Sequence, residues 1–205
     1  MTAESSLGSG DRRQWAHGER REGIIQAAIR VVAQGGLGRI TYRSVAEEAG
    51  VAHGLVRHHF GSIDALVEEA LQVCITRTVT TIGLNPGSGN PEDFARGIVE
   101  SLQRDPDTQF FQYEVLLESR RTESLRESVD KMMAHYRSVV REGLQRMGLS
   151  ADHELVEFVY ATVEGIVLQQ SVRGLATEAE EAVTVLRQVL TLLKREQKTG
   201  SNRPR

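Results

Sequence analysis

The stretch RITYRSVAEEAGVAHGLVRHHFGSIDALVEEA, residues 39–70, organises the rest of this 205-residue chain. Thr41 is a natural N-cap, because its hydroxyl oxygen can accept a hydrogen bond from a free backbone amide at the start of a helix. Gly50 supplies the positive φ of a sharp turn, and Ala46 is small enough to let two short helices cross closely. A second short helix follows over residues 52–60. The stretch therefore predicts a helix-turn-helix unit.

The second short helix has an apolar back and a polar front. Val56 and Phe60 are four residues apart, so they share the inward face. The outer face carries His53, Gly54, Arg57 and His58. Imidazole and guanidinium groups donate hydrogen bonds to purine N7 and O6 and to phosphates, and glycine lets another surface approach closely. This front predicts a surface that reads DNA.

The charge of the chain predicts no general affinity for polyanions. The net charge is −3, and residues 20–70 carry six arginines and six acidic residues. If this region binds DNA, the acids must face away from the duplex. Much of the affinity must then come from individually placed contacts and from pairing two copies of the chain.

The composition is ordinary for a globular protein, with 40% hydrophobic and 26% charged residues. No apolar run approaches the roughly 20 residues needed to span a bilayer, and the N-terminus lacks the apolar core of a signal peptide. The single cysteine, Cys74, cannot form an internal disulfide, which fits a reducing compartment. We expect a cytoplasmic protein with no membrane partner.

Helical periodicity continues through the rest of the chain. Apolar residues recur three and four positions apart, and glycines, prolines and capping residues separate the runs. We expect helices over about 20–34, 41–49, 52–60, 63–82, 91–105, 108–120, 122–147, 151–173 and 178–194. The predicted fold class is all-α, with about nine helices.

Several residues of the N-terminal region match the pattern of a known family. They are Gly36-Leu37, Thr41-x-Arg43-x-Val45-Ala46, Ala49-Gly50-Val51, Gly54, and His59-Phe60 followed by Ala65-Leu66. Over about residues 20–75 the chain resembles the N-terminal domain of the TetR (tetracycline-repressor type) family of bacterial transcriptional regulators. The remainder resembles the family in helix count and order and in Glu164-Gly165-Ile166. The resemblance implies an N-terminal three-helix helix-turn-helix domain and a C-terminal helical domain for ligand binding and dimerisation.

We place the DNA-binding domain at residues 19–66 and the ligand-binding and dimerisation domain at residues 67–198. The two ends of the chain lack helical periodicity. We therefore expect a disordered N-terminal arm over residues 1–18 and a disordered tail over residues 199–205.

The resemblance also implies which residues meet DNA. In the family, the residues that match Thr41–Arg43 and His53–His59 contact the DNA backbone or bases. The predicted contacts are Thr41, Tyr42, Arg43, His53, Gly54, Arg57, His58 and His59. The chain departs from the family at Arg57, where Tyr is usual, and at Ile63, where Lys is common. Arg57 keeps a phosphate-binding group, whereas Ile63 removes a cation, so no contact is assigned to it.

The histidines at positions 53, 58 and 59 do not predict a metal site. Spacings of five and one on a helix do not place the imidazoles on a common face, and no carboxylate pattern joins them. His59 is expected to lie half-buried near the end of its helix. We expect no metal and no cofactor.

An effector site in the C-terminal domain requires an apolar cavity with a few polar groups. Aromatic side chains, leucine, methionines and one mid-helix carboxylate are the candidates. They are Phe94, Phe110, Phe111, Tyr113, Leu116, Met132, Met133, Tyr136, Phe158 and Glu164. For each of them, ordinary core packing is the alternative. Glu164 could meet a donor of the ligand or pair with Arg120 or Arg121, and the set favours a small, largely apolar ligand.

The last helix carries more apolar surface than one core-facing stripe needs. Leucines and valines recur three and four apart, with Val189 and Leu192 beside them. Surplus apolar surface on the last two helices predicts a homodimer interface. The predicted interface residues are Val159, Val163, Ile166, Val183, Leu186, Leu190 and Leu193. The alternative is that the last helix only closes its own domain.

The leading hypothesis is a sequence-specific, homodimeric DNA-binding regulator without catalytic activity. It would be a repressor that leaves a palindromic operator when a small molecule binds. The alternative is a helical adaptor that keeps the fold but has lost DNA binding, which the neutral charge and Ile63 favour. An all-helical enzyme is a weaker alternative, because no Glu-x-x-His pair, P-loop, Gly-x-Ser-x-Gly or His-Glu-x-x-His motif occurs.

Overall fold

The computed structural model describes residues 17–200, and within this range the chain is all α, with nine α-helices, three short 3-10 helices and no strand. The helices are α1 (His17–Gly35), η1 (Leu37–Arg39), α2 (Tyr42–Ala49), α3 (His53–Phe60), α4 (Ile63–Ile82), η2 (Pro91–Asp93), α5 (Ile98–Arg104), α6 (Pro106–Glu118), η3 (Glu123–Leu125), α7 (Arg126–Arg146), α8 (His153–Arg173) and α9 (Ala176–Gly200). The predicted fold class is confirmed. No helix between residues 17 and 200 is long and apolar enough to cross a bilayer.

The helix-turn-helix unit forms for the predicted local reasons. The Thr41 hydroxyl accepts a hydrogen bond from the Ser44 amide at 3.0 Å, and the Ser44 hydroxyl accepts one from the Thr41 amide at 2.9 Å. This capping box satisfies two backbone donors at the start of α2. Gly50 ends α2 with φ 67°, a left-handed conformation that glycine adopts without strain. Two short helices, α2 and α3, result with a tight turn between them.

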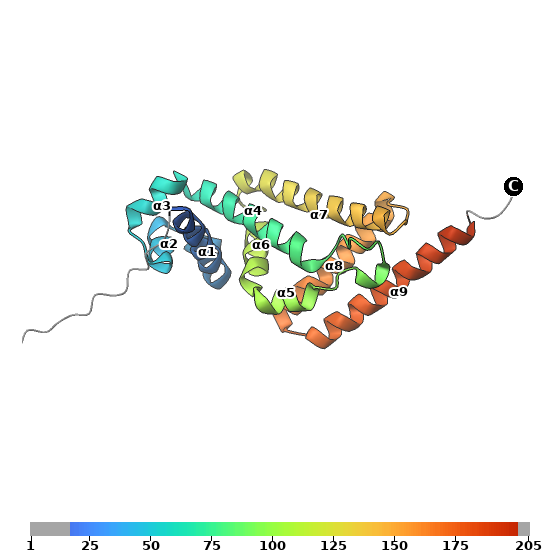
Figure 1. Cartoon of the computed structure of the whole chain (residues 1–205). Helices are drawn as coiled ribbons and strands as arrows, with labels where there is room; N and C mark the ends of the chain where they lie inside the picture. The colour runs from blue at the N-terminus through green and yellow to red at the C-terminus, as the bar shows by residue number, and fades with distance from the viewer. Residues whose placement is uncertain (1–16, 201–205) are drawn as a thin grey trace, which may run out of the picture.

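The first hydrophobic core joins the helix-turn-helix end of the molecule to its body. It is built from α1–α4 together with α6 and the first half of α7. Phe111 and Val115 on α6 are completely buried in it. In Figure 1, α4 runs from the end that holds α1, α2 and α3 into the body. The predicted domain boundary at residues 66 and 67 falls inside this continuous helix.

The second hydrophobic core fills the body, between the end of α4, α5, α7, α8 and α9. Close backbone packing holds the 83–90 segment against α7. A Cβ atom on Gly143 would lie 2.3 Å from the Leu84 carbonyl oxygen, so only glycine fits at this contact. The long α8 and α9 pack together and form the far side of the body from α1, α2 and α3 (Figure 1).

The largest differences between the observed and the predicted helix ends occur in four places. Residues 17–18 belong to α1 and residues 199–200 belong to α9, so the predicted arm and tail are wrong at these positions; residues 1–16 and 201–205 lie outside the described residues. Pro91 opens the separate turn η2, because the backbone is extended at Phe94 and has φ 56° at Ala95, and α5 begins only at Ile98. Near residue 122 the chain forms η3 first, so α7 begins at Arg126.

Candidate DNA-binding surface and effector cavity

The front of α3 is exposed as predicted. His53, Gly54, Arg57 and His58 lie on the surface, while the two inward residues of α3 are buried in the first core. A Cβ atom added to Gly54 would meet no atom within 4 Å, so the surface there is open to close approach. Among the described residues, Arg57 makes no ion pair, which leaves its guanidinium available to a phosphate or a base.

Tyr42 joins the two helices of the unit. Its hydroxyl donates a hydrogen bond to the Gly61 carbonyl oxygen at 2.7 Å. Its ring also lies edge-on to the ring of His53, with 6.1 Å between centroids. Tyr42 therefore fixes the start of α2 to both ends of α3, so part of its function is to orient the exposed front.

Arg43 is exposed on α2 and forms an ion pair. Its Nε atom lies 2.8 Å from a carboxylate oxygen of Glu47, one helical turn away. The hydrogen bond and the negative charge of Glu47 raise the pKa of the Arg43 guanidinium. Both side chains are strongly exposed, so a DNA phosphate can compete for Arg43 at small cost.

Three further residues of α3 and α4 are partly covered. His59 is half-buried, with its ring 5.7 Å from that of His58 and 6.3 Å from that of Phe60. Leu55 and Ile63 are half-buried and pack against the first core. The apolar residue at position 63 thus contributes to packing at the start of α4. Within the described part of the chain, no three His, Cys, Asp or Glu side chains are arranged to hold a metal.

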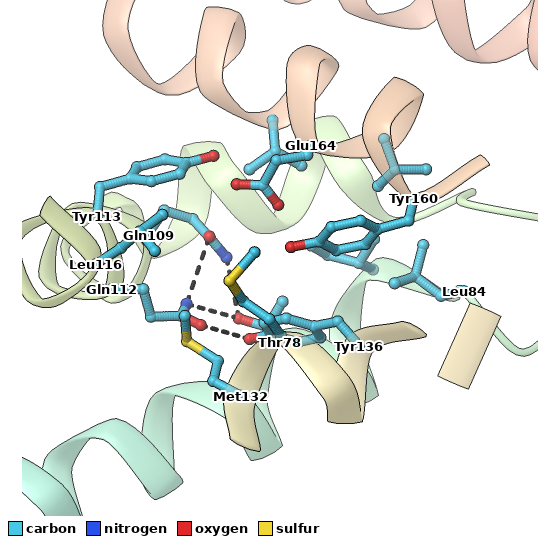
Figure 2. A pocket seen from close by; sticks show the side chains of 14 residues that line it. Thr78, Leu84, Gln109, Gln112, Tyr113, Leu116, Met132, Tyr136, Tyr160 and Glu164 are labelled. Carbon is cyan, nitrogen blue, oxygen red and sulfur yellow. Dashed lines mark hydrogen bonds between the residues drawn. The ribbon is translucent and has the colours of Figure 1, made fainter. Parts of the chain in front are cut away.

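A cavity lies in the body between α4, α6, α7 and α8 (Figure 2). The space between its side chains is about 540 Å³, including the part open to solvent. The cavity volume itself is only about 40 Å³, so the cavity is narrow. Six predicted residues line it: Tyr113, Leu116, Met132, Met133, Tyr136 and Glu164.

The four phenylalanines predicted for this site do not line the cavity. Phe94 is completely buried in the second core, and Phe111 in the first. Phe110 is half-buried away from the cavity, and Phe158 lies exposed on the outside of α8. The reason for the error on α6 is geometric. Because successive helical residues are about 100° apart, the face of α6 that meets the cavity differs from the face that meets α1.

Sequence reasoning identified Tyr136 but missed the other three members of the polar wall of the cavity. Its members are Thr78 on α4, Gln109 and Gln112 on α6, and Tyr136 on α7. The amides of Gln109 and Gln112 donate to the Thr78 hydroxyl oxygen at 3.0 and 3.1 Å, and the Tyr136 hydroxyl donates to the Gln112 amide oxygen. Paired glutamines three apart on a helix that also carries Tyr113 were the available signal. The network ties α4, α6 and α7 together at the cavity (Figure 2).

Glu164 lies on the opposite wall, mostly buried. Burial raises the pKa of its carboxyl group, and the nearby Tyr113 hydroxyl and Arg137 lower it in part. The Tyr113 hydroxyl faces the carboxylate (Figure 2) but makes no hydrogen bond of ordinary geometry. The predicted ion pair with Arg120 or Arg121 does not form among the described residues: Arg121 pairs with Glu118 instead.

The residues predicted for the dimer interface belong to the core of the single protomer. Val159, Val163, Ile166, Val183, Leu186 and Leu190 are buried in the second core, and Leu193 packs half-buried against it. The same two helices also carry exposed apolar side chains, which we call the outer stripe. It comprises Leu168 and Val172 on α8, exposed by 44% and 63%, and Val185 and Leu192 on α9, exposed by 58% and 57%. The surplus apolar surface exists, but on the outer stripe.

Two family models match the chain. Residues 24–70 match the model described as "Bacterial regulatory proteins, tetR family". Residues 89–192 match the model described as "Tetracyclin repressor-like, C-terminal domain". The first match contains the whole helix-turn-helix unit, and the second spans most of the body, including the cavity-lining part of α6, α7 and α8.

Curated relatives and solved structures agree with these matches. The chain is 27% identical over 161 residues to the HTH-type transcriptional regulator BetI of Agrobacterium fabrum, covering 76% of this chain and 78% of that protein. It is 33% identical over 108 residues to the HTH-type transcriptional repressor KstR of Rhodococcus jostii, covering 51% and 50%. A TetR-family structure from Streptomyces coelicolor is similar with a TM-score of 0.67 at 29% identity, covering 85% of this chain and 98% of that one. The multidrug binding protein EbrR complexed with imidazole is similar with a TM-score of 0.62 at 29% identity, covering 85% and 94%.

Proposed function

The chain belongs to the TetR family of bacterial transcriptional regulators, and on this basis we propose that it is a homodimeric repressor that binds a palindromic operator and leaves it when a small, largely apolar effector enters the cavity. The named relatives are regulators and repressors of transcription, so the enzyme hypothesis is set aside.

The exposed front of α3 is the observation that carries the DNA-binding proposal. The apolar face of α3 is buried in the core, and its opposite face exposes His53, Arg57 and His58. Arg57 forms no ion pair among the described residues. Such groups suit contacts with phosphates and base edges in a major groove. The proposed contact set remains Thr41, Tyr42, Arg43, His53, Gly54, Arg57, His58 and His59. Because the region is electrically neutral, these placed groups must supply the affinity.

The exposed stripe on α8 and α9 supports the dimer. Leu168, Val172, Val185 and Leu192 form apolar surface that no other described segment covers. A twofold pair through this face places a second recognition helix on the same DNA. Half-sites about 34–36 Å apart then meet the two helices in successive major grooves. The proposed interface consists of this stripe and excludes the buried residues beside it.

The position of α6 supports the effector mechanism. One face of α6, with Gln112 and Leu116, lines the cavity, and another, with Phe111 and Val115, supports α1 in the first core. Because the cavity is narrow, a bulky ligand must displace the helices around it. Such a ligand binds the spread form of the protein more tightly than the closed form, and this differential affinity shifts the population of the two forms. The DNA-binding ends then move relative to each other.

The test is selection of DNA from a random oligonucleotide pool by the full chain, followed by mobility-shift titration on the selected site. We expect a palindromic site, a steep loss of affinity with salt, and weaker binding by Arg43→Ala and Arg57→Ala with dimerisation unchanged. No selected site would instead support the adaptor hypothesis. Unchanged affinity in both variants would overturn the contact assignment.

A further inference from the structure

Glu164 carries a mostly buried carboxylate that forms no ion pair among the described residues. It projects from the middle of α8 into the cavity, between the hydroxyl ends of Tyr113 and Tyr160 (Figure 2). Arg137 is the basic group whose charge acts on Glu164, but it is paired elsewhere. Its Nε atom lies 2.6 Å from a carboxylate oxygen of Glu157, and its guanidinium lies over the Tyr160 ring, 4.4 Å from the centroid. A buried charge ordinarily requires a partner, and within the described structure Glu164 has no ion-pair partner.

The rest of the cavity wall suits a positively charged organic molecule. No Lys, Arg or His lines the cavity, so an anion would meet the carboxylate with nothing to offset it. Three tyrosines, Tyr113, Tyr136 and Tyr160, line the cavity, and the face of an aromatic ring attracts cations. Met132 and Met133 add polarisable, adaptable side chains that can follow the outline of an apolar body. The wall therefore combines one negative charge with aromatic and thioether surface.

From this arrangement we infer that the cavity binds a lipophilic cation, such as an aromatic amine or quaternary ammonium compound, with its positive charge against the Glu164 carboxylate. The inference rests on the proposed function, because it names the chemical class of the effector for the same cavity. The Gln109–Gln112 wall opposite Glu164 receives the other end of the ligand, where it can exchange hydrogen bonds with a polar substituent.

The binding of a cation is linked to the ionisation of Glu164. Burial raises the pKa of its carboxyl group, and a bound cation would lower that pKa again. The other groups that face the carboxylate do not titrate near neutral pH. Burial also raises the pKa values of Tyr113 and Tyr136, and it raises that of Tyr160 to about 12. Arg137 stays charged in its pair with Glu157.

Three acridine probes of similar size test the inference on the full chain: cationic proflavin, uncharged acridine and anionic acridine-9-carboxylate. Affinities are measured by fluorescence titration and calorimetry for the wild type, Glu164→Gln and, as a matched control, Glu154→Gln at an exposed position of the same helix. The wild type is expected to prefer proflavin over the other two. Glu164→Gln should weaken the binding of proflavin at least tenfold, about 1.4 kcal/mol, and leave the binding of acridine nearly unchanged. Glu154→Gln should bind all three probes as the wild type does.

A wild type that prefers acridine or the anion would overturn the inference, as would proflavin affinity unaffected by Glu164→Gln. The wild-type preference needs no variant, so it holds as a test even if Glu164→Gln fails to fold. Operator release is scored separately. If a neutral compound releases the operator and this release does not depend on Glu164, the repressor proposal stands and the inference of a cationic effector is overturned. Glu164-dependent proflavin binding without any effect on operator binding would support the cation site and overturn the effector mechanism.

Discussion

Replacing Val185 and Leu192 with glutamine should separate the proposed homodimer without unfolding the protomer. Both side chains lie on the outer stripe of α9, exposed by 58% and 57%. Glutamine is a good helix former, so α9 should persist. The change removes apolar surface that would be buried only when two copies meet.

The size of the effect follows from the exposed surface. Burying a whole Val or Leu side chain contributes about 1.5–3 kcal/mol, so the exposed half of each contributes about 1–1.5 kcal/mol. A dimer contains four such side chains, which together give about 4–6 kcal/mol. The dissociation constant should therefore rise by a factor of about 10³–10⁴.

Leu186→Gln is the matched control on the same helix. Leu186 is 3% exposed and lies in the second core. An amide there would leave a cavity and an unsatisfied polar group, so the protomer should lose about 2–5 kcal/mol of unfolding free energy. Analytical ultracentrifugation over a dilution series measures the dimer, and urea unfolding at concentrations where the protein is monomeric measures the protomer.

Two results would refute this assignment of the stripes. One is a double variant of Val185 and Leu192 that stays dimeric with the wild-type dissociation constant. The other is a Leu186→Gln protein that is monomeric yet has the unfolding free energy of a wild-type protomer. The second result would place Leu186 in the interface, as its periodicity alone had suggested.

Arg57→Ala should weaken operator binding and lower the slope of log affinity against log salt by about two per dimer, since each subunit loses one phosphate contact; an unchanged slope in a mobility-shift series would exclude that contact. Glu47→Gln should strengthen operator binding, because it removes an exposed negative charge and leaves Arg43 to the phosphates. Glu48→Gln, whose carboxylate pairs with α1 instead, is its control, and equal gains in both would point to net charge alone. Burial holds the folded-state pKa of Glu164 above its ordinary value of 4.5, so the stability of ligand-free protein should fall as pH rises from there through the folded-state pKa. Urea unfolding across that range should show the fall in the wild type, and its persistence in Glu164→Gln would assign it to another group.

The helix-turn-helix unit could be derived from residues 39–70 because its determinants are local. The Thr41 cap, the turn at Gly50 and the inward pair on α3 each act within one or two helical turns. The all-α fold could be predicted for the same reason, because the apolar spacing of a helix and the residues that end it are both visible in the sequence. Helix ends were less certain where a 3-10 turn preceded the helix, as at η2 and η3.

The cavity was only partly predictable. Tyr113, Met132 and Glu164 could be nominated from residue type, and they do line it. The phenylalanines are equally suited by residue type to line an apolar cavity, but Phe94 and Phe111 fill the two cores instead. Residue type states what a side chain prefers to contact, and it does not state which neighbour supplies that contact.

The two apolar stripes of α9 show where local information ends. The repeat along the helix revealed that α9 has more apolar surface than one core needs, and this was correct. It could not tell that Leu186 and Leu190 close the protomer while Val185 and Leu192 stay exposed. Periodicity records the angular spread of apolar side chains around one axis, whereas burial depends on where α8 and the other helices lie in space. Caps, turns and helical faces are therefore properties of the chain itself, and the division of those faces among core, cavity and partner surface arises only when the helices pack.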